Sequence, residues 1–105
     1  MTFKKQEVKA RMWSENKPDG RFEPVQGYVL GDYSYRKEGS VYSITHNPSG
    51  YAVGGYVNKA GRARRLCELL NTCPIKYDGK GEIPREFVNE LGKIIREFRE
   101  SGGAA

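Results

Sequence analysis

The chain of 105 residues carries 18 Lys and Arg against 13 Asp and Glu, giving a net charge of +5, and its mean hydropathy is −0.74. It has room for a single domain, residues 1–105, and its seven Tyr and four Phe argue against disorder. No apolar run approaches the roughly 20 residues of a membrane span, and no signal peptide is visible, so a cytoplasmic protein is expected. Residues 1–7 and 101–105 are expected to be flexible.

The positive charge is concentrated in one part of the chain. Through Arg65 there are 12 Lys and Arg against 6 Asp and Glu, whereas from Leu66 onward there are 6 against 7. This asymmetry favours one face suited to a polyanion, although mild basicity also serves solubility alone.

The first 37 residues predict strands and a turn. Residues 1–13 alternate as a half-buried strand does, but they also fit a helix, and Trp13 is either core or an exposed anchor. Turn chemistry follows at Pro18-Asp19-Gly20. The Tyr- and Val-rich segment Gln26–Lys37 predicts a strand with a possible bulge at Gly31.

Two further strands and a helix follow. A tight connection at Glu38-Gly39 leads to a strand at Val41–His46, and another strand is predicted at Tyr51–Val57. Asn58 is a good N-cap for a helix over Lys59–Leu70. The helical spacing i, i+3, i+4, i+7 predicts one buried face made of Ala63, Leu66, Cys67 and Leu70.

The last third predicts a connector and a second helix. A short hairpin is possible at Asp78-Gly79, and Pro84 suits the first turn of a helix. The apolar stripe of that helix consists of Phe87, Leu91, Ile94, Ile95 and Phe98. The expected fold is α+β, an antiparallel sheet of three or four strands with two amphipathic helices packed on one face.

The segment His46-Asn47-Pro48-Ser49-Gly50 raises the question of a Ser–His nucleophile. Asn-Pro-Ser-Gly matches a type I turn position by position, and a left-handed Gly50 would close a hairpin between two strands. A catalytic pair needs a third group to orient the imidazole, and neither a nucleophile elbow nor an oxyanion loop surrounds Ser49. A turn is therefore the favoured interpretation.

Other catalytic signatures are missing, so no enzyme, no catalytic residue and no cofactor is expected. The segment "GGYVNKAGR" lacks the spacing of a P-loop. Cys67, Cys73 and the single His46 lack the spacing of a metal site, and the two thiols are expected to be reduced.

Candidate binding residues lie on the strands and at the start of the first helix. Tyr33 and Tyr35 share a strand face and could form a stacking platform, with phosphate-binding cations beside them. These cations are Arg36, Lys37, Lys59, Arg62 and Arg65. The helix N-terminus within Gly54–Arg62 also suits a phosphate, and an ordinary capped helix explains it equally well.

The segment "YSYRKEGSVYSITHNPSGYAVGGYVNKAGRARRLCELL", residues 33–70, resembles the three-strand-plus-helix core of AP2-like and integrase arm-type DNA-binding domains. It is also similar to short accessory proteins of phages and other mobile elements. The resemblance implies that Tyr35, Arg36 and Lys37 face the major groove while the Lys59–Leu70 helix backs the sheet.

The expected function is therefore that of a small, basic, non-catalytic nucleic-acid-binding accessory protein of a phage or mobile element. The alternatives are an inhibitor that binds a host protein, such as a defence or nucleic-acid enzyme, and a protein that sequesters a nucleotide. Neither membrane nor metal is an expected partner, and the oligomeric state stays open.

Overall fold

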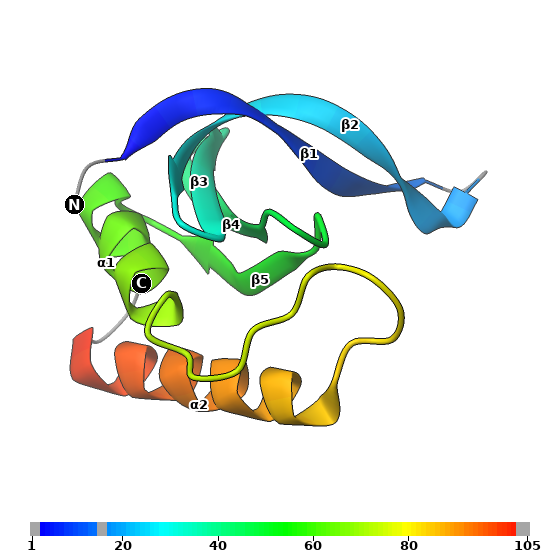
Figure 1. The fold of residues 1–105 in the computed structure, drawn as a ribbon. Coiled ribbons are helices and arrows are strands. Elements are labelled where there is room, and N and C mark those ends of the chain that lie inside the picture. The colour runs from blue at the N-terminus through cyan, green and yellow to red at the C-terminus, as the bar shows by residue number, and fades with distance from the viewer. Residues whose placement is uncertain (1–2, 15–16, 103–105) are drawn as a thin grey trace.

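The computed structural model describes residues 3–14 and 17–102, with side chains for residues 3–10 and 24–100 (Figure 1). Five strands precede two helices: β1 Lys4–Ser14, β2 Lys17–Leu30, β3 Tyr33–Glu38, β4 Val41–His46, β5 Ala52–Val57, α1 Ala60–Leu70 and α2 Arg85–Gly102. The strands form one antiparallel sheet in chain order. The expected α+β class is confirmed, but the sheet has five strands rather than three or four.

The first additional strand comes from a long hairpin. β1 pairs with β2 from Lys4–Val29 to Ser14–Lys17, so the strand interpretation of residues 1–13 is correct, and residues 4–7 belong to β1. Pro18-Asp19-Gly20 lies within β2, so the turn predicted there is wrong. β2 pairs with β3 only over Tyr28–Leu30, and the rest of the hairpin extends beyond the sheet (Figure 1).

The second additional strand arises at Gly31. The sequence predicted one strand over Gln26–Lys37, but the chain reverses at Gly31-Asp32 and Tyr28 pairs with Tyr35. Gly31 has φ +60, a left-handed conformation that a tight hairpin turn requires and that glycine adopts without strain. The glycine therefore marks a turn instead of the expected bulge.

The central strands have two differently covered faces. Cross-strand pairing puts Tyr33, Tyr35 and Ile44 on the face that packs against the helices, and all are at most 2% exposed. Small polar residues, Ser34, Ser43 and Thr45, are buried on the other face. β1 and β2 arch over the sheet on the side away from α2 (Figure 1). Both faces are thus withdrawn from solvent at the centre of the sheet.

The helices bury the faces that their sequence periodicity predicts. Ala63, Leu66, Cys67 and Leu70 of α1 are buried, and Phe87, Leu91 and Phe98 of α2 join the same core. Both cysteines are buried free thiols, and burial raises the pKa of Cys67 to about 12. None of the helices in the described ranges is long and apolar enough to cross a membrane.

Two local details of the helical part differ from expectation. The N-cap of α1 is Lys59 rather than Asn58, and no side chain caps it. The hairpin proposed at Asp78-Gly79 does not form, because Gly79 instead packs against the backbone of Pro48 in the β4–β5 turn.

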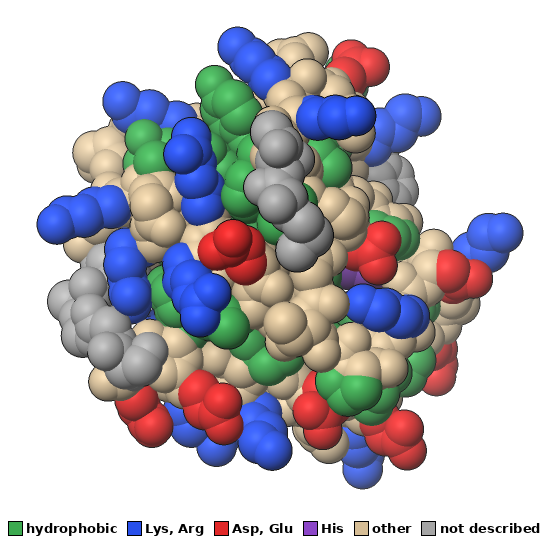
Figure 2. All heavy atoms as spheres, turned by 60° about the vertical axis from the view of Figure 1, so that its left-hand side comes forward, with side chains coloured by type: hydrophobic (Ala, Val, Ile, Leu, Met, Phe, Trp, Pro, Cys, Tyr) green, Lys and Arg blue, Asp and Glu red, His purple; other side chains and the backbone are tan. Residues whose placement is uncertain are grey.

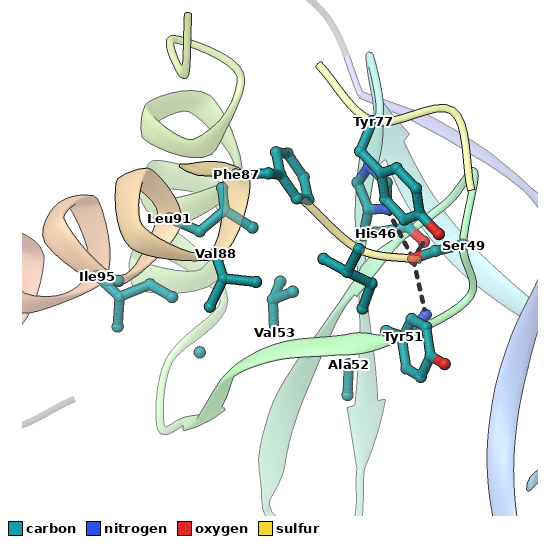
Figure 3. Close-up of a pocket in the computed structure, with 13 residues that line it drawn as sticks. His46, Ser49, Tyr51, Ala52, Val53, Tyr77, Phe87, Val88, Leu91 and Ile95 are labelled. Atoms are coloured by element: carbon teal, nitrogen blue, oxygen red, sulfur yellow. Dashed lines mark hydrogen bonds between the residues drawn. The ribbon is translucent and has the colours of Figure 1, made fainter. Parts of the chain in front are cut away.

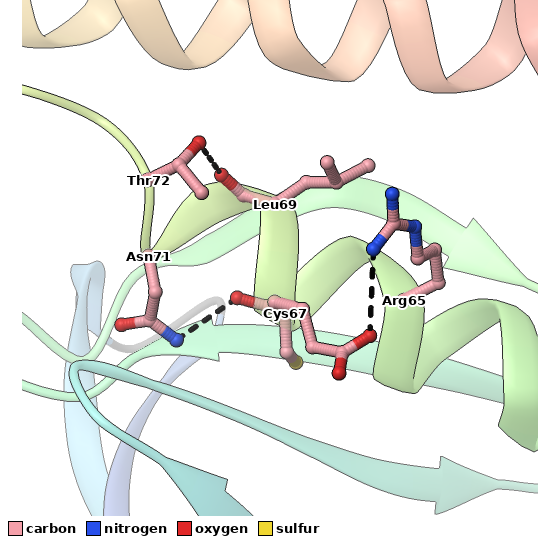
Figure 4. A network of polar contacts seen from close by, with 6 residues as sticks. Arg65, Cys67, Leu69, Asn71 and Thr72 are labelled. Atoms are coloured by element: carbon pink, nitrogen blue, oxygen red, sulfur yellow. Dashed lines mark hydrogen bonds and ion pairs between the residues drawn. The ribbon is translucent and has the colours of Figure 1, made fainter. Parts of the chain in front are cut away.

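A single amide side chain fixes the C-terminal end of α1 to the β2–β3 turn. Asn71 Nδ2 donates to the carbonyl oxygens of Leu30 (2.8 Å) and Cys67 (2.9 Å), and its Oδ1 accepts from the Asp32 amide (3.2 Å). Figure 4 shows the bond to Cys67 at the end of the helix. A Cβ at Gly31 would lie 2.4 Å from Asn71 Oδ1, so the clamp also requires glycine at this turn.

Replacing Asn71 by Ala is expected to lower the free energy of unfolding by about 1–3 kcal/mol, because backbone groups at both ends of the clamp lose their partners. Urea unfolding followed by circular dichroism measures the change. Asn58→Ala is the matched control, since Asn58 is exposed and provides no cap, and a change within about 0.5 kcal/mol is expected. Equal losses for the two variants would contradict the clamp.

Candidate functional site

The two tyrosines predicted as a stacking platform lie in the core. Tyr33 and Tyr35 are each 2% exposed, so their prediction as an open platform is wrong. Tyr33 contacts the ring of His46 at 5.3 Å between centroids, and burial is the main cause that raises its pKa. The face of β3 that was expected to meet a ligand is the face that the helices cover.

The five predicted cations do not form one cluster. Arg36 lies on the opposite sheet face from Lys37 and forms an ion pair with Glu38. Because Tyr35, Arg36 and Lys37 alternate between faces, they cannot all face one groove, as the resemblance implied. Lys37 and Lys59 are exposed.

Arg62 and Arg65 lie on another side of the molecule, in a hollow between α1 and α2. The guanidinium of Arg62 sits 4.1 Å from the ring centroid of Phe98 and donates to the Phe98 carbonyl at 3.3 Å, so it joins the two helices. Arg65 is exposed, and its guanidinium lies 3.8 Å from Glu68 Oε1. The dashed line at Arg65 in Figure 4 marks this ion pair.

The structure instead brings together an aromatic cluster that the sequence did not predict. Tyr28 stacks on Tyr35 with ring centroids 5.2 Å apart and an interplanar angle of 20°. Phe3 and Tyr42 meet Tyr35 edge-on, at 5.3 and 6.0 Å. Tyr28 remains 38% exposed, so the cluster has a buried centre and an accessible aromatic edge.

Three cations surround this cluster. Lys5 pairs across the strands with Tyr28, and Lys37 pairs with Tyr42, which places each beside an aromatic neighbour on the same face. Arg64 Nε donates to the Tyr35 hydroxyl at 2.7 Å, and this bond is the main cause that raises the pKa of Arg64.

We call this region the Tyr28 surface, defined as Phe3, Lys5, Tyr28, Tyr35, Lys37, Tyr42 and Arg64. Figure 1 places the start of β1 and α1 on one side of the molecule, and Figure 2 turns that side forward. Lys and Arg side chains gather over the upper and left parts of that view, while most Asp and Glu lie in its lower part and on its right, with one acidic side chain near the centre. Among the sequence-predicted residues, only Tyr35 and Lys37 belong to the surface.

A turn with a left-handed Gly50 closes the hairpin between β4 and β5 as predicted, but the carbonyl that accepts from Gly50 belongs to His46 rather than to Asn47. Gly50 has φ +76, the Gly50 amide donates to the His46 carbonyl at 2.7 Å, and the His46 amide donates to the Tyr51 carbonyl at 2.9 Å. The turn nevertheless brings two side chains together: His46 Nδ1 lies 2.7 Å from Ser49 Oγ, and both residues are buried.

This Ser–His pair has the hydrogen bond of a nucleophilic dyad, but its surroundings are those of a pair that stabilises a turn. Ser49 Oγ also accepts from the Tyr51 amide at 3.2 Å, which ties the hydroxyl to the backbone of its own turn. The His46 ring is surrounded by Tyr33, Tyr77 and Phe87. Among the described residues, no carboxylate hydrogen-bonds to the imidazole, and the negative charge of Asp32 only partly opposes the effect of burial on the pKa of His46.

The turn is also fixed from outside by Gly79, which has φ +85. A Cβ there would lie 2.0 Å from the Pro48 carbonyl oxygen, whereas a Cβ at Gly81, with φ +71, meets nothing within 4 Å. Gly79→Ala is therefore expected to lower the free energy of unfolding by about 1–3 kcal/mol more than Gly81→Ala. Both variants put an alanine into a left-handed backbone conformation and so carry a similar strain. The difference between their free energies of unfolding in chemical denaturation therefore reports the contact with the Pro48 carbonyl. Indistinguishable midpoints would rule the contact out.

Burial lowers the pKa of His46 below its ordinary value. The unfolded chain then binds the proton more readily, so the contribution of His46 to stability is complete above about pH 6.5 and is lost as the pH falls through that value toward the folded pKa. His46 is the only histidine in the sequence, and proton NMR of its ring reports this pKa directly.

In urea unfolding, the free energy of unfolding is expected to fall between about pH 7.5 and pH 5 in the wild type. The free energy of unfolding of His46→Gln should fall less over the same pH range. For each protein, the change is measured relative to its own value at pH 7.5. A ring pKa at or above that of a free histidine would contradict the prediction.

Comparison of the chain with protein-family models, with curated proteins and with solved structures finds no match in any of the three. Within the part of the chain that the structure describes, no group of three or more His, Cys, Asp or Glu could hold a metal ion.

Proposed function

We propose that the protein binds single-stranded nucleic acid on the Tyr28 surface and acts there by binding rather than by catalysis. The observation that carries the proposal is the Tyr28–Tyr35 stack, whose inner ring is fixed by Phe3, Tyr42 and Arg64 while the outer ring stays accessible. A rigid, partly exposed tyrosine offers a flat face on which an unpaired base can stack.

The cations around the stack support the same proposal. Lys5 and Lys37 are exposed, and their strand pairings place them on either side of the aromatic cluster, beside Tyr28 and Tyr42. A nucleic-acid backbone that follows a stacked base can therefore meet a cation on each side. Arg64 contributes a third positive charge, held in place by the Tyr35 hydroxyl.

The surface favours a single strand over a duplex. Bases in a duplex already stack on one another, and an aromatic side chain gains stacking energy only from a base that is unpaired. The Ser49–His46 pair does not contribute to this surface, because Ser49 is 4% exposed and bonds within its own turn.

Fluorescence anisotropy with labelled oligothymidylate of about 15 nucleotides tests the proposal over a range of salt concentrations. Affinity should fall as salt rises, and Lys5→Ala and Lys37→Ala should each reduce the slope of log K against log salt by about 0.7. Tyr28→Ala should weaken binding by about 1–3 kcal/mol, and Tyr28→Phe by much less, because the ring is retained. A duplex of the same length should bind more weakly.

The chain provides matched controls. Lys93 is an exposed lysine on α2, and Tyr56 is 62% exposed on the opposite sheet face, so Lys93→Ala and Tyr56→Ala should leave affinity and slope unchanged. Glu7 follows Lys5 on the same face of β1, and Glu7→Gln should strengthen binding by removing a like charge to phosphate. Salt-independent binding, or no binding of any oligonucleotide, would sink the proposal.

A further inference from the structure

A separate apolar pocket shares no residue with the Tyr28 surface. It has a volume of about 320 Å³ and is bounded by β5, the 46–51 turn, the connector before α2, and α2 itself (Figure 3). Three of the five large hydrophobic side chains that are exposed among the described residues line it: Tyr51, Ile83 and Val88. Their exposure concentrates apolar surface at one hollow, and exposed apolar surface gathered in this way often marks a binding site.

The pocket combines apolar walls with a polar pair. Val53, Phe87 and Leu91 line it beside the Ser49–His46 pair, as the close-up in Figure 3 shows. Tyr77 lies parallel to the His46 ring, at 9° and 5.9 Å between centroids, and Phe87 meets the same ring at 5.2 Å. This is a common composition for a small-molecule site, where hydrophobic surface supplies affinity and a few polar groups fix orientation.

The lining also restricts the charge of the occupant. None of the described residues that line the pocket is Lys, Arg, Asp or Glu, so a charged molecule would lose its hydration without gaining a partner. Charged residues line two neighbouring hollows. The hollow that shares Tyr77 with the pocket contains Lys80 and Glu82, and the one that shares Val88 and Gly92 contains Lys93 and Arg96.

These charged borders also limit the apolar area. A stable protein interface buries about 800 Å² on each partner, and an apolar patch confined to one pocket does not provide a hydrophobic centre of that extent. A small molecule is therefore a better match for this pocket than a partner protein.

We propose that this pocket binds a small uncharged molecule with an aromatic or branched apolar body and one hydrogen-bonding group directed at the His46 ring, since Ser49 Oγ already bonds to His46 and to the Tyr51 amide. The volume lies at the lower end of the range for ligand pockets, which limits the occupant to about the size of a substituted single ring. The proposal is independent of nucleic-acid binding, because it shares no residue with the Tyr28 surface.

Binding can be measured with p-cresol as the probe, by following amide shifts of pocket residues in two-dimensional NMR of the full chain. Saturable shifts are expected at Val53, Val88 and Leu91. Toluene, which lacks the hydroxyl, should bind about three- to tenfold more weakly, and p-toluate, which carries a charge, should not bind detectably.

Gly92→Leu is the blocking variant. Gly92 lines the pocket on α2, and a Cβ there meets no atom within 4 Å, so the new side chain can occupy the space while the loss of a helical glycine favours folding. Gly61→Leu is the matched control, since Gly61 is an equally open glycine on α1, outside the pocket. Cresol binding should be lost in Gly92→Leu and unchanged in Gly61→Leu. Val88→Glu, at the exposed mouth of the pocket, should also lower the affinity for cresol at least tenfold.

Several results would overturn the proposal. They include the absence of saturable shifts with cresol, equal affinity for toluene and cresol, binding of p-toluate, and retained binding in both Gly92→Leu and Val88→Glu. Concentration-dependent shifts of the same residues without any probe, abolished by Gly92→Leu, would instead identify a second copy of the chain as the occupant.

Discussion

The side chain of Asn71 joins the C-terminal end of α1 to the β2–β3 turn of the sheet. Its amide bonds to the last turn of α1 and to both sides of the β2–β3 turn, so one side chain joins segments about 40 residues apart in the chain. The turn that it holds sets the pairing of Tyr28 with Tyr35. The aromatic cluster, and with it the proposed nucleic-acid surface, therefore depends on a contact that lies outside both.

The sequence predicted the second half of the fold better than the first. The apolar faces of both helices and the Asn47–Gly50 turn follow from periodicity and turn chemistry, which are local properties. The extent of the β1–β2 hairpin does not, because Pro18-Asp19-Gly20 is typical of a turn and yet lies inside β2, in the part of the strand that pairs only with β1. The reversal at Gly31 was read as a bulge, since its need for glycine comes partly from Asn71, which is distant in sequence.

The candidate site was harder to predict for a related reason. Alternation shows which residues share a strand face, but not which face the helices cover. Tyr33 and Tyr35 share a face as expected, yet that face is the core, and Arg62 is used to hold α2. Tyr28 became relevant only through the Gly31 turn, and Arg64 through its bond to Tyr35. These relations are tertiary and leave no motif in the sequence.

The surroundings of His46 have a consequence for the study of folding. The imidazole belongs to β4, but the rings that cover it, Tyr77 and Phe87, come from the connector and from α2. A sheet formed without these segments would leave the ring covered only by Tyr33 and more exposed to water, with a pKa closer to its ordinary value. The one histidine of the chain is thus an intrinsic spectroscopic reporter, and its ring signals distinguish a molecule whose C-terminal third has docked from one in which only the strands have assembled.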